Sequence, residues 1–489
     1  MLLKLDGSGL LHLQLYRALR AQVLGGRLHP GTRLPSTRVL AVDNGLSRNT
    51  VTLAFEQLIG EGYASVRRGS GTYVTAHLPD EATSVLRRPD AGLTRPAVRP
   101  RLSRFGETIR DWRVSWAART ARLACDFRYG RPAFRDFPHA TWRQHLARRA
   151  RRASARDLDY GPPEGAPSLR EAIADYLHRA RAVVCDAARV VIVNGSQQAL
   201  DLTARVLLDR GDRVLLEEMH YAGARSVFLA AGARIVTAPV DGDGLDVAAL
   251  GRRRRGIRLA YVTPSHQFPT GAIMPLSRRL DLLAWAARED AHVLEDDYDG
   301  EYRYVGRPLE SLQGLDRTGR VIYTGTFSKL MFPALRLGYV VVPEALVGPF
   351  VAAKALADTG GASLEQLALA DFIRAGHFER HVRRSRARNA ARRAVLLDAI
   401  AKHLGDRVEV AGVNAGIHVL LWVRRLPAKK LPALVRRAEA AGVGVFPITP
   451  HCAKPPDRAG VLLGYASLTD AAIRDGIRRL AIALDDLSA

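Results

Sequence analysis

Hydrophobic positions in the first 75 residues follow the 3.6-residue period of amphipathic helices. The predicted inner faces consist of Leu11, Leu15, Leu19 and Val23 in one helix and of Val51, Ala54, Phe55, Leu58 and Ile59 in another. Between these helices, Ser36 opens a short helix that Gly45 closes, and Ser47 is the predicted N-cap of the helix that follows. Two short apolar runs around the glycine turn at 69–71 then predict a β-hairpin. Three helices followed by a hairpin predict a winged helix-turn-helix unit over residues 1–75.

Residues 76–122 lack this periodicity. Prolines are scattered there among arginines and small residues, so we predict a linker with one amphipathic stretch near 105–116. From residue 123 to residue 489, helical patterns alternate with short apolar runs at 189–193, 213–216, 259–263, 292–294 and 321–323. This alternation predicts an α/β domain with a largely parallel sheet.

The net charge of the chain gives only partial information about its binding partner. The 489 residues include 73 Lys and Arg against 49 Asp and Glu, a formal net charge of +24. Such an excess favours contact with a polyanion, nucleic acid first. The excess is nearly all arginine, however, and a genome rich in G and C also inflates arginine. The arginine runs at 143–156 and 380–393 fit solvated helix faces as well as auxiliary DNA contacts, so charge alone leaves the partner open.

The cysteine spacing and the length of the apolar runs indicate the cellular compartment of the protein. Cys125, Cys185 and Cys452 stand far apart without CxxC spacing, which excludes a disulfide framework and a zinc ribbon, and we expect no metal site. The N-terminal segment lacks the apolar core and cleavage site of a signal peptide, and no stretch approaches the roughly 18 apolar residues of a membrane span. These features predict a soluble, cytoplasmic protein without a membrane partner.

Three segments within residues 34–74, LPSTRVLA, LSRNTVTLAFEQL and GSGTYV, resemble the GntR-type winged-helix domain. Arg48, Asn49 and Thr50 stand at the start of the predicted third helix, opposite its apolar face, where side chains and the helix dipole can meet bases and phosphates. The resemblance implies contact with a double-stranded DNA operator through Arg38, Ser47, Arg48, Asn49, Thr50, Thr52, Arg68 and Gly69. The alternative is a winged helix that contacts only protein.

The segment YTGTFSKLMFPALRLGY at 323–339 places a lysine after small hydroxyl residues at the end of an apolar run. This arrangement is typical of a site for pyridoxal phosphate, because Lys329 can condense with the aldehyde of that cofactor. The phosphate can be held by Thr326, Ser328 and Arg336.

Two upstream segments complete the predicted cofactor site. In LEDDY, Asp296 would keep the pyridine nitrogen protonated and Tyr298 would donate to the phenolic oxygen of the ring. In NGSQQAL, at a junction from strand to helix, Gly195, Ser196 and Gln197 would offer amides and side chains to the phosphate. The candidate catalytic residues are Lys329, Asp296 and Tyr298.

The order of these segments resembles the aspartate aminotransferase-like class of fold-type I transferases that depend on pyridoxal phosphate. With TPSHQFPTG at 263–271, EDDYDGEYRY at 295–304 and the GntR-like unit, nearly the whole chain resembles the MocR family of transcriptional regulators. The resemblance implies a homodimer whose aminotransferase-like domain senses an effector. It also implies that Tyr221 stacks on the cofactor ring, that His266 lies beside its phenolic oxygen, and that Tyr160 reaches the phosphate of the neighbouring subunit.

Two positions depart from these relatives. Gly223 stands where the GABA-responsive type carries an effector-binding arginine, so GABA is an unexpected effector here. Leu462 stands where aminotransferases carry the arginine that binds the substrate α-carboxylate, and a leucine cannot form the paired hydrogen bonds that fix a carboxylate. Arg128 or Arg131 could substitute, but nothing in the sequence places them.

Three functions therefore stand side by side. The first is a regulator that senses pyridoxal phosphate or an amino compound through Schiff-base chemistry. The second is an active aminotransferase with an appended DNA-binding domain, and the third is a regulator with a vestigial cofactor site. Leu462 favours the regulator over the enzyme, and the presence of both Lys329 and Asp296 disfavours the vestigial site. The effector, the operator, the direction of regulation and any exchange of DNA-binding domains between subunits stay open.

Overall fold

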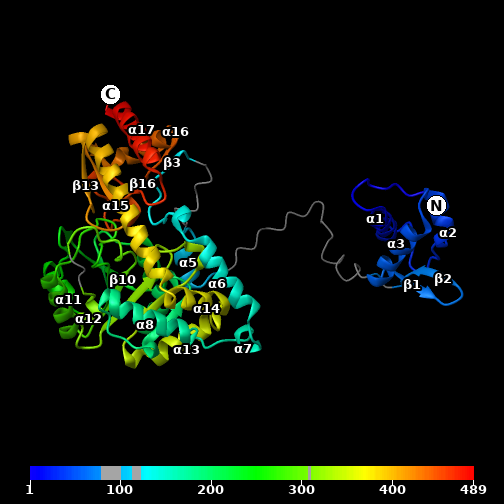
Figure 1. Ribbon diagram of the computed structural model, residues 1–489, viewed down its shortest axis with the longest axis horizontal. Helices are drawn as coiled ribbons and strands as arrows, with labels where there is room; N and C mark the ends of the chain where they lie inside the picture. Colours follow the sequence, from blue (N-terminus) through cyan, green and yellow to red (C-terminus); the bar gives the residue numbers. More distant parts are fainter. Residues whose placement is uncertain (77, 79–100, 113–122, 307–309, 489) are drawn as a thin grey trace. The chain divides into compact units, whose positions relative to one another are not determined.

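The computed structural model describes residues 1–76, 78, 101–112, 123–306 and 310–488. The chain divides into two compact units, Met1–Pro100 and Arg101–Ala489 (Figure 1). Among the described residues, no helix combines the length and the apolar character needed to cross a bilayer.

The first unit is a winged helix-turn-helix, as predicted. Its elements are α1 (Leu11–Leu24), α2 (Thr37–Asn44), α3 (Arg48–Gly60), β1 (Ala64–Arg67) and β2 (Gly71–Val74). Ser36 and Ser47 cap α2 and α3, since their hydroxyls accept hydrogen bonds from backbone N–H groups at 3.3 and 3.1 Å. Gly45 ends α2 at a φ of +65°, a left-handed conformation that glycine adopts without steric cost. The predicted caps and hairpin are therefore confirmed.

A seven-stranded sheet organises the second unit, in the order β4-β12-β11-β10-β9-β5-β6. The strands are β4 (Val190–Val193), β5 (Arg213–Glu217), β6 (Arg234–Ala238), β9 (Ile257–Val262), β10 (His292–Asp297), β11 (Val321–Thr326) and β12 (Gly338–Val341). Only β12 runs antiparallel to its neighbours in this sheet, which confirms the predicted largely parallel arrangement. Most of the predicted cofactor residues lie at or beyond the carboxyl ends of strands of this sheet, namely β4, β5, β9, β10 and β11.

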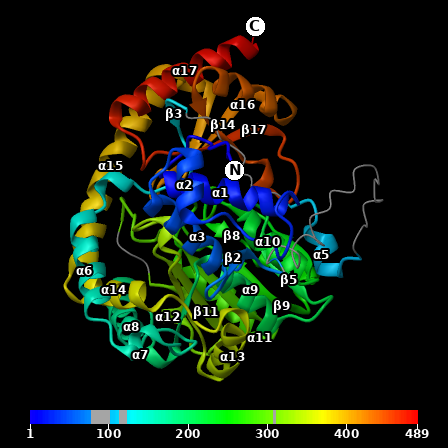
Figure 2. The same cartoon turned by 90° about the vertical axis from the view of Figure 1, so that its right-hand side faces the viewer.

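Helices cover both faces of this sheet (Figure 2). One face is packed by α9 (Ser196–Leu207), α10 (Ala222–Ala230) and α13 (Val347–Asp358), and the other by α8 (Pro167–Arg181), α11 (Leu276–Arg288) and α14 (Ser363–Arg374). Alternate residues of the strands serve the two faces: Leu294 and Ile322 lie in one apolar cluster, and Val293 and Val321 in another. The strands are thus buried on both sides, as continuous apolar runs require.

A C-terminal lobe follows the long helix α15 (His377–His403). Its antiparallel sheet has the order β13-β14-β17-β16, with β13 (Val408–Ala411), β14 (His418–Pro427), β16 (Phe446–Pro447) and β17 (Arg458–Gly464). The helices α16 (Leu431–Ala440) and α17 (Asp470–Ser488) complete it, and α15 runs from the neighbourhood of α14 to α17 (Figure 1).

The predicted linker is only partly visible. Residues 79–100 and 113–122 lie outside the described residues. Within the amphipathic stretch expected near 105–116, the structure shows a short helix, α5 (Arg104–Ile109), capped by Ser103. The Trp112 indole donates a hydrogen bond to Ser226 of α10 at 3.0 Å, so this end of the predicted linker packs on the second unit.

Candidate cofactor site and nucleic-acid interface

Lys329 lies just beyond the carboxyl end of β11. Its Nζ donates a hydrogen bond to the Gly130 carbonyl at 3.1 Å, and a side chain on Gly130 would approach Nζ to 2.8 Å. Burial lowers the pKa of Lys329, while the charges of Asp299 and Asp296 oppose the shift. A lowered pKa increases the fraction of neutral amine, which is the form that attacks a carbonyl.

Asp296, near the end of β10, is 4% exposed. Its Oδ2 accepts a hydrogen bond from the Tyr261 hydroxyl at 2.8 Å, whereas its Oδ1 is buried without a hydrogen-bond partner among the described residues. A buried acceptor without a donor is costly, and the protonated ring nitrogen of pyridoxal phosphate is the kind of donor that would satisfy it. Asp296 therefore fits that cofactor.

The predicted phosphate-binding residues meet at the start of α9. Its first turn has no side-chain cap, which leaves backbone N–H groups available to an anion. Gly195 has a φ of +82°, and a Cβ there would come within 2.9 Å of the Arg336 guanidinium, which itself bonds to the Asn194 carbonyl. This glycine gives Arg336 room beside the helix N-terminus, an arrangement that fits a phosphate dianion.

The remaining predicted phosphate and stacking residues lie around this junction. The Ser328 N–H donates to the Thr326 hydroxyl at 3.1 Å in the turn that follows β11. Tyr221 is the N-cap residue of α10, and a Cβ at Gly223 would lie within 2.6 Å of both Tyr221 and Gln197. The structure thus brings Tyr221 and Gln197 together beside a glycine that has no space for a side chain.

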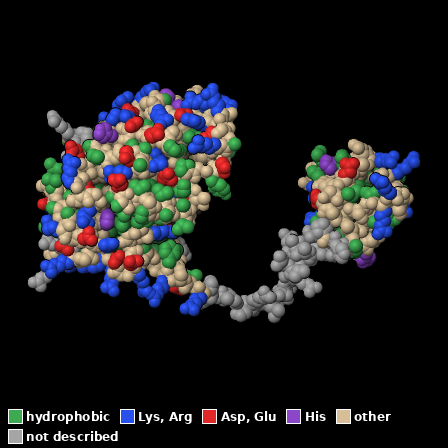
Figure 3. Space-filling model, turned by 90° about the horizontal axis from the view of Figure 1, so that it is seen from below, with side chains coloured by type: hydrophobic (Ala, Val, Ile, Leu, Met, Phe, Trp, Pro, Cys, Tyr) green, Lys and Arg blue, Asp and Glu red, His purple; other side chains and the backbone are tan. Residues whose placement is uncertain are grey.

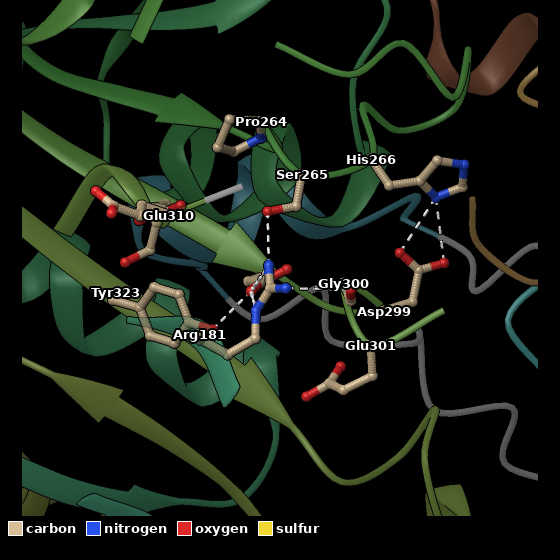
Figure 4. Close-up of polar contacts among 12 residues, drawn as sticks. Arg181, Pro264, Ser265, His266, Asp299, Gly300, Glu301, Glu310 and Tyr323 are labelled. Atoms are coloured by element: carbon tan, nitrogen blue, oxygen red, sulfur yellow. Dashed lines mark hydrogen bonds and ion pairs between the residues drawn. The ribbon is translucent and has the colours of Figure 1, made fainter. Parts of the chain in front are cut away.

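Tyr298 and His266 also meet. The Tyr298 hydroxyl lies 2.9 Å from His266 Nδ1, and that nitrogen lies 3.1 Å from Asp299 Oδ1 (Figure 4). His266, Asp299 and His418 are buried, with ligand-capable atoms within 4.8 Å of one another. Because His266 and Asp299 already hydrogen-bond beside Tyr298, we assign this group to the candidate cofactor site.

Leu462 lies fully buried in β17. It belongs to an apolar cluster with Phe268, Leu420, Phe446 and Ile448, which Tyr221 and Tyr298 border. Arg128 and Arg131, the two candidate substitutes for a carboxylate clamp, lie 3.3 and 3.6 Å from Asp126 and flank Gly130. The position expected to bind a carboxylate is therefore occupied by an apolar cluster, while both nearby arginines share one carboxylate.

Tyr160 is 86% exposed. Its backbone N–H is held by Asp159, but its side chain forms no hydrogen bond with the described residues of its own chain. The implied contact with a neighbouring subunit stays a prediction.

Sequence reasoning missed the residues that hold the end of β10 in place. Arg181, buried at the end of α8, pairs with Asp297 at 2.6 Å and donates to Ser265 at 2.9 Å and to the Gly300 carbonyl at 3.2 Å (Figure 4). The Tyr323 hydroxyl donates to the same Asp297 carboxylate at 2.6 Å. These contacts fix the residue next to Asp296. Of these residues, Arg181 lies outside every segment that the sequence singles out, whereas Ser265, Asp297, Gly300 and Tyr323 lie inside such segments without having been chosen.

Burial raises the pKa of Asp296 to about 7, and it raises the pKa values of Glu217, Glu295 and Glu301 to about 7 as well. A carboxyl group with a higher pKa in the folded chain contributes stability below its unfolded pKa, and this contribution is lost as pH rises through the folded pKa. For the protein without cofactor, we therefore expect the free energy of unfolding to fall between about pH 4 and pH 7.

Asp296→Asn should make that fall smaller, by at most about 4 kcal/mol, because each pKa unit corresponds to about 1.4 kcal/mol. Denaturant unfolding at a series of pH values measures the effect, with the exposed Asp243→Asn as control. If both variants follow the parent, the pKa of Asp296 is not raised by burial.

The first unit exposes the residues predicted to contact DNA. Arg38, Ser47, Arg48, Asn49, Arg68 and Gly69 are exposed, and Thr50 and Thr52 are half-buried. The hydroxyls of Ser47 and Thr50 bond to each other at 2.8 Å, so part of their role is to cap α3. Arg67, on the wing, stacks on Tyr73 at 4.6 Å, and Figure 3 shows Lys and Arg side chains exposed on this unit. The arrangement offers the start of α3 and a basic wing to a polyanion.

Comparison with known families assigns both units. The model for "Bacterial regulatory proteins, gntR family" matches residues 11–74, and that for "Aminotransferase class I and II" matches residues 131–480. The probable rhizopine catabolism regulatory protein MocR of Rhizobium meliloti is 40% identical over 477 residues, covering 97% of this chain and 94% of the relative. The pyridoxine biosynthesis transcriptional regulator PdxR of Corynebacterium glutamicum is 30% identical over 463 residues, covering 94% and 93%.

Solved structures agree for the second unit. The kynurenine aminotransferase of Pyrococcus horikoshii matches with a TM-score of 0.71 and 27% identity, covering 83% of this chain and 100% of that one. LysN, the alpha-aminoadipate aminotransferase of Thermus thermophilus, has a TM-score of 0.71 and 31% identity, covering 79% and 98%. The predicted fold, a winged helix-turn-helix joined to a fold-type I aminotransferase domain, is confirmed. This chain belongs to the MocR family of helix-turn-helix transcriptional regulators with an aminotransferase-like domain.

Proposed function

We propose that this regulator binds pyridoxal phosphate at Lys329 and senses either that cofactor or an amino compound through Schiff-base chemistry. The observation that carries the proposal is the pairing of a complete lysine–aspartate site with a closed carboxylate position. Lys329 and Asp296 come from the carboxyl ends of the neighbouring strands β11 and β10, which supports a shared site, while Leu462 is packed into an apolar cluster. The names of two relatives, regulators of pyridoxine biosynthesis and of rhizopine catabolism, support a small-molecule response.

When bound, pyridoxal phosphate supplies an aldehyde that condenses with amines and a ring that withdraws electrons. The residues of the chain would bind and orient the cofactor. Arg336 and the N-terminus of α9 would hold the phosphate, and Asp296 would hold a proton at the ring nitrogen. The Tyr298 hydroxyl donates to the His266 carbonyl at 3.0 Å in this structure, and it would have to turn that hydrogen toward the ring to donate to the phenolic oxygen. These residues orient an amine but offer no paired donor at Leu462 to hold an α-carboxylate for proton removal.

The binding energy of such a ligand can instead shift the protein between two states that differ in operator affinity. The shift is limited to the difference in ligand affinity between those states. A homodimer, in which Tyr160 reaches the neighbouring site, would place two DNA-binding units on one operator. The exposure of Tyr160 supports this arrangement.

The second candidate is an active aminotransferase. The 31% identity to LysN favours it, as do Arg128 and Arg131, which flank the Gly130 that contacts Lys329. If one of these arginines leaves Asp126, it could pair with a substrate carboxylate.

Selection of bound fragments from genomic DNA tests the proposed function. The full chain should enrich a discrete set of sites, and the amount of DNA retained at those sites should change with pyridoxal phosphate or with an amine added to the loaded protein. Lys329→Ala should enrich the same sites without the response to ligand. If none of the ligands changes the amount of DNA retained at these sites, the sensing role is contradicted.

A further inference from the structure

A cavity lies in the aminotransferase-like domain, where α6 (His139–Arg151) ends against the turn between α14 and α15. Figures 1 and 2 show α6 beside α14 and α15, and the three helices pack together. The cavity has a volume of about 540 Å³ and is lined by Gln144, His145, Arg148, Arg151, Arg152, Ala375 and His377. None of these residues belongs to the cofactor site described above.

His145 gives this cavity a defined hydrogen-bond donor. The side chain is 6% exposed, and its Nδ1 accepts a hydrogen bond from Arg148 at 2.9 Å. Because Nδ1 is the acceptor, the proton of the neutral ring resides on Nε2. That N–H has no hydrogen-bond partner among the described residues, and the ring lines the cavity, so it can donate to a bound group.

The charged groups of the lining are all cations. Arg148 is partly compensated by Asp371 at 2.9 Å, an acid that Arg149 also binds at 2.7 Å. Arg151 and Arg152 are exposed and form no ion pair or side-chain hydrogen bond with any residue that the structure describes. Arginines in the last turn of α6 do stabilise the negative end of that helix, but this role requires neither a cavity nor the fixed tautomer of His145.

The start of α15 adds to the positive potential. This 27-residue helix begins at His377, which lines the cavity, and its N-cap residue Gly376 has no side chain to satisfy the N–H groups of the first turn. Such a terminus attracts negative charge. A negatively charged ligand is therefore favoured by all three features, namely the arginines, the His145 N–H and the helix terminus.

We propose that this cavity binds the phosphate group of a small anion, at a site separate from that of the cofactor. Three guanidinium groups and a fixed N–H suit a tetrahedral oxyanion, which accepts several hydrogen bonds at once. A phosphate of the DNA backbone has the same chemistry, but His145 is only 6% exposed, and a small anion reaches so buried a group more easily than a duplex does.

Titration of the full chain, loaded with pyridoxal phosphate, with inorganic phosphate at constant ionic strength tests the proposal. Binding should be saturable and should shift the NMR signals of the His145 ring. Arg151→Gln/Arg152→Gln should weaken binding on the order of tenfold or more, since two charge-assisted contacts are lost. The control is Arg143→Gln/Arg156→Gln, which removes two exposed arginines outside the cavity and changes the net charge equally.

Equal weakening in both double variants, or phosphate binding that does not saturate, would overturn the site. Operator affinity, measured for the same variants at matched salt, separates the two sources of phosphate. We expect it to be equal in both double variants. A selective loss of operator affinity in the cavity variant, without phosphate binding to the parent, would show a contact with DNA and would also overturn the proposal.

Discussion

Lys329→Ala should abolish covalent binding of pyridoxal phosphate. Lys329 is held against the Gly130 carbonyl within the electrostatic influence of Asp296, and its lowered pKa favours the neutral amine that condenses with an aldehyde. Reduction with borohydride fixes the cofactor to the lysine that carries it, and mass spectrometry of the digested protein then identifies that residue. The parent should show one modified peptide, and the variant should show none.

The control for this experiment is Lys454→Ala, which removes an exposed lysine of the same domain. It should retain the modified peptide of the parent. An adduct mapped to another lysine in the parent would refute the assignment of Lys329. Noncovalent binding can persist in Lys329→Ala, because Arg336 and the start of α9 are unchanged.

Arg48→Ala should weaken specific operator binding by about 1–3 kcal/mol, which is the range for a side chain that reads a base. Arg48 is exposed at the first position of α3, next to the Ser47 cap, and its Nε lies 3.4 Å from the Thr37 hydroxyl. Electrophoretic or fluorescence titration with the selected operator measures the loss at fixed salt. Binding should also fall steeply as salt is raised, because phosphate contacts release counterions.

Arg27→Ala is the matched control, since Arg27 is an exposed arginine of the same unit that follows α1. It should change operator affinity much less than Arg48→Ala. If both variants bind the operator like the parent at matched salt, α3 does not place Arg48 against the DNA.

The local elements of this fold could be predicted because their signals are local. Ser36, Gly45 and Ser47 mark helix ends through hydrogen bonds and a φ value set by the next few residues. The strands of the parallel sheet could also be predicted, since strands that are buried on both faces need continuous runs of apolar side chains. Because Asp296 and Lys329 stand at the ends of two such runs, the sequence also predicts that both lie at the carboxyl ends of parallel strands.

The contacts that position this site could not be predicted from the sequence. Arg181 and Asp297 are 116 residues apart, and the sequence offers no reason to choose this arginine among the many on helices. In the sequence, Tyr261 is one residue of an apolar run, and nothing there indicates that its hydroxyl donates a hydrogen bond to Asp296. The sequence singles out Leu462, but only the packing shows that Phe268 and Leu420 lie in the same apolar cluster. The contact predicted for Tyr160 is with a neighbouring subunit, and it stays a prediction.

In the proposed function, the aminotransferase-like domain senses a ligand rather than turning it over. The most direct measurement follows keto product and operator affinity in the same samples, across amino acids, amines and pyridoxal phosphate. We expect at least one ligand to change operator affinity, and we expect keto product to form far more slowly than an ordinary enzyme rate of about 1 per second. Steady turnover at about 1 per second or faster, with no ligand effect on operator binding, would contradict the proposed function and establish the aminotransferase instead.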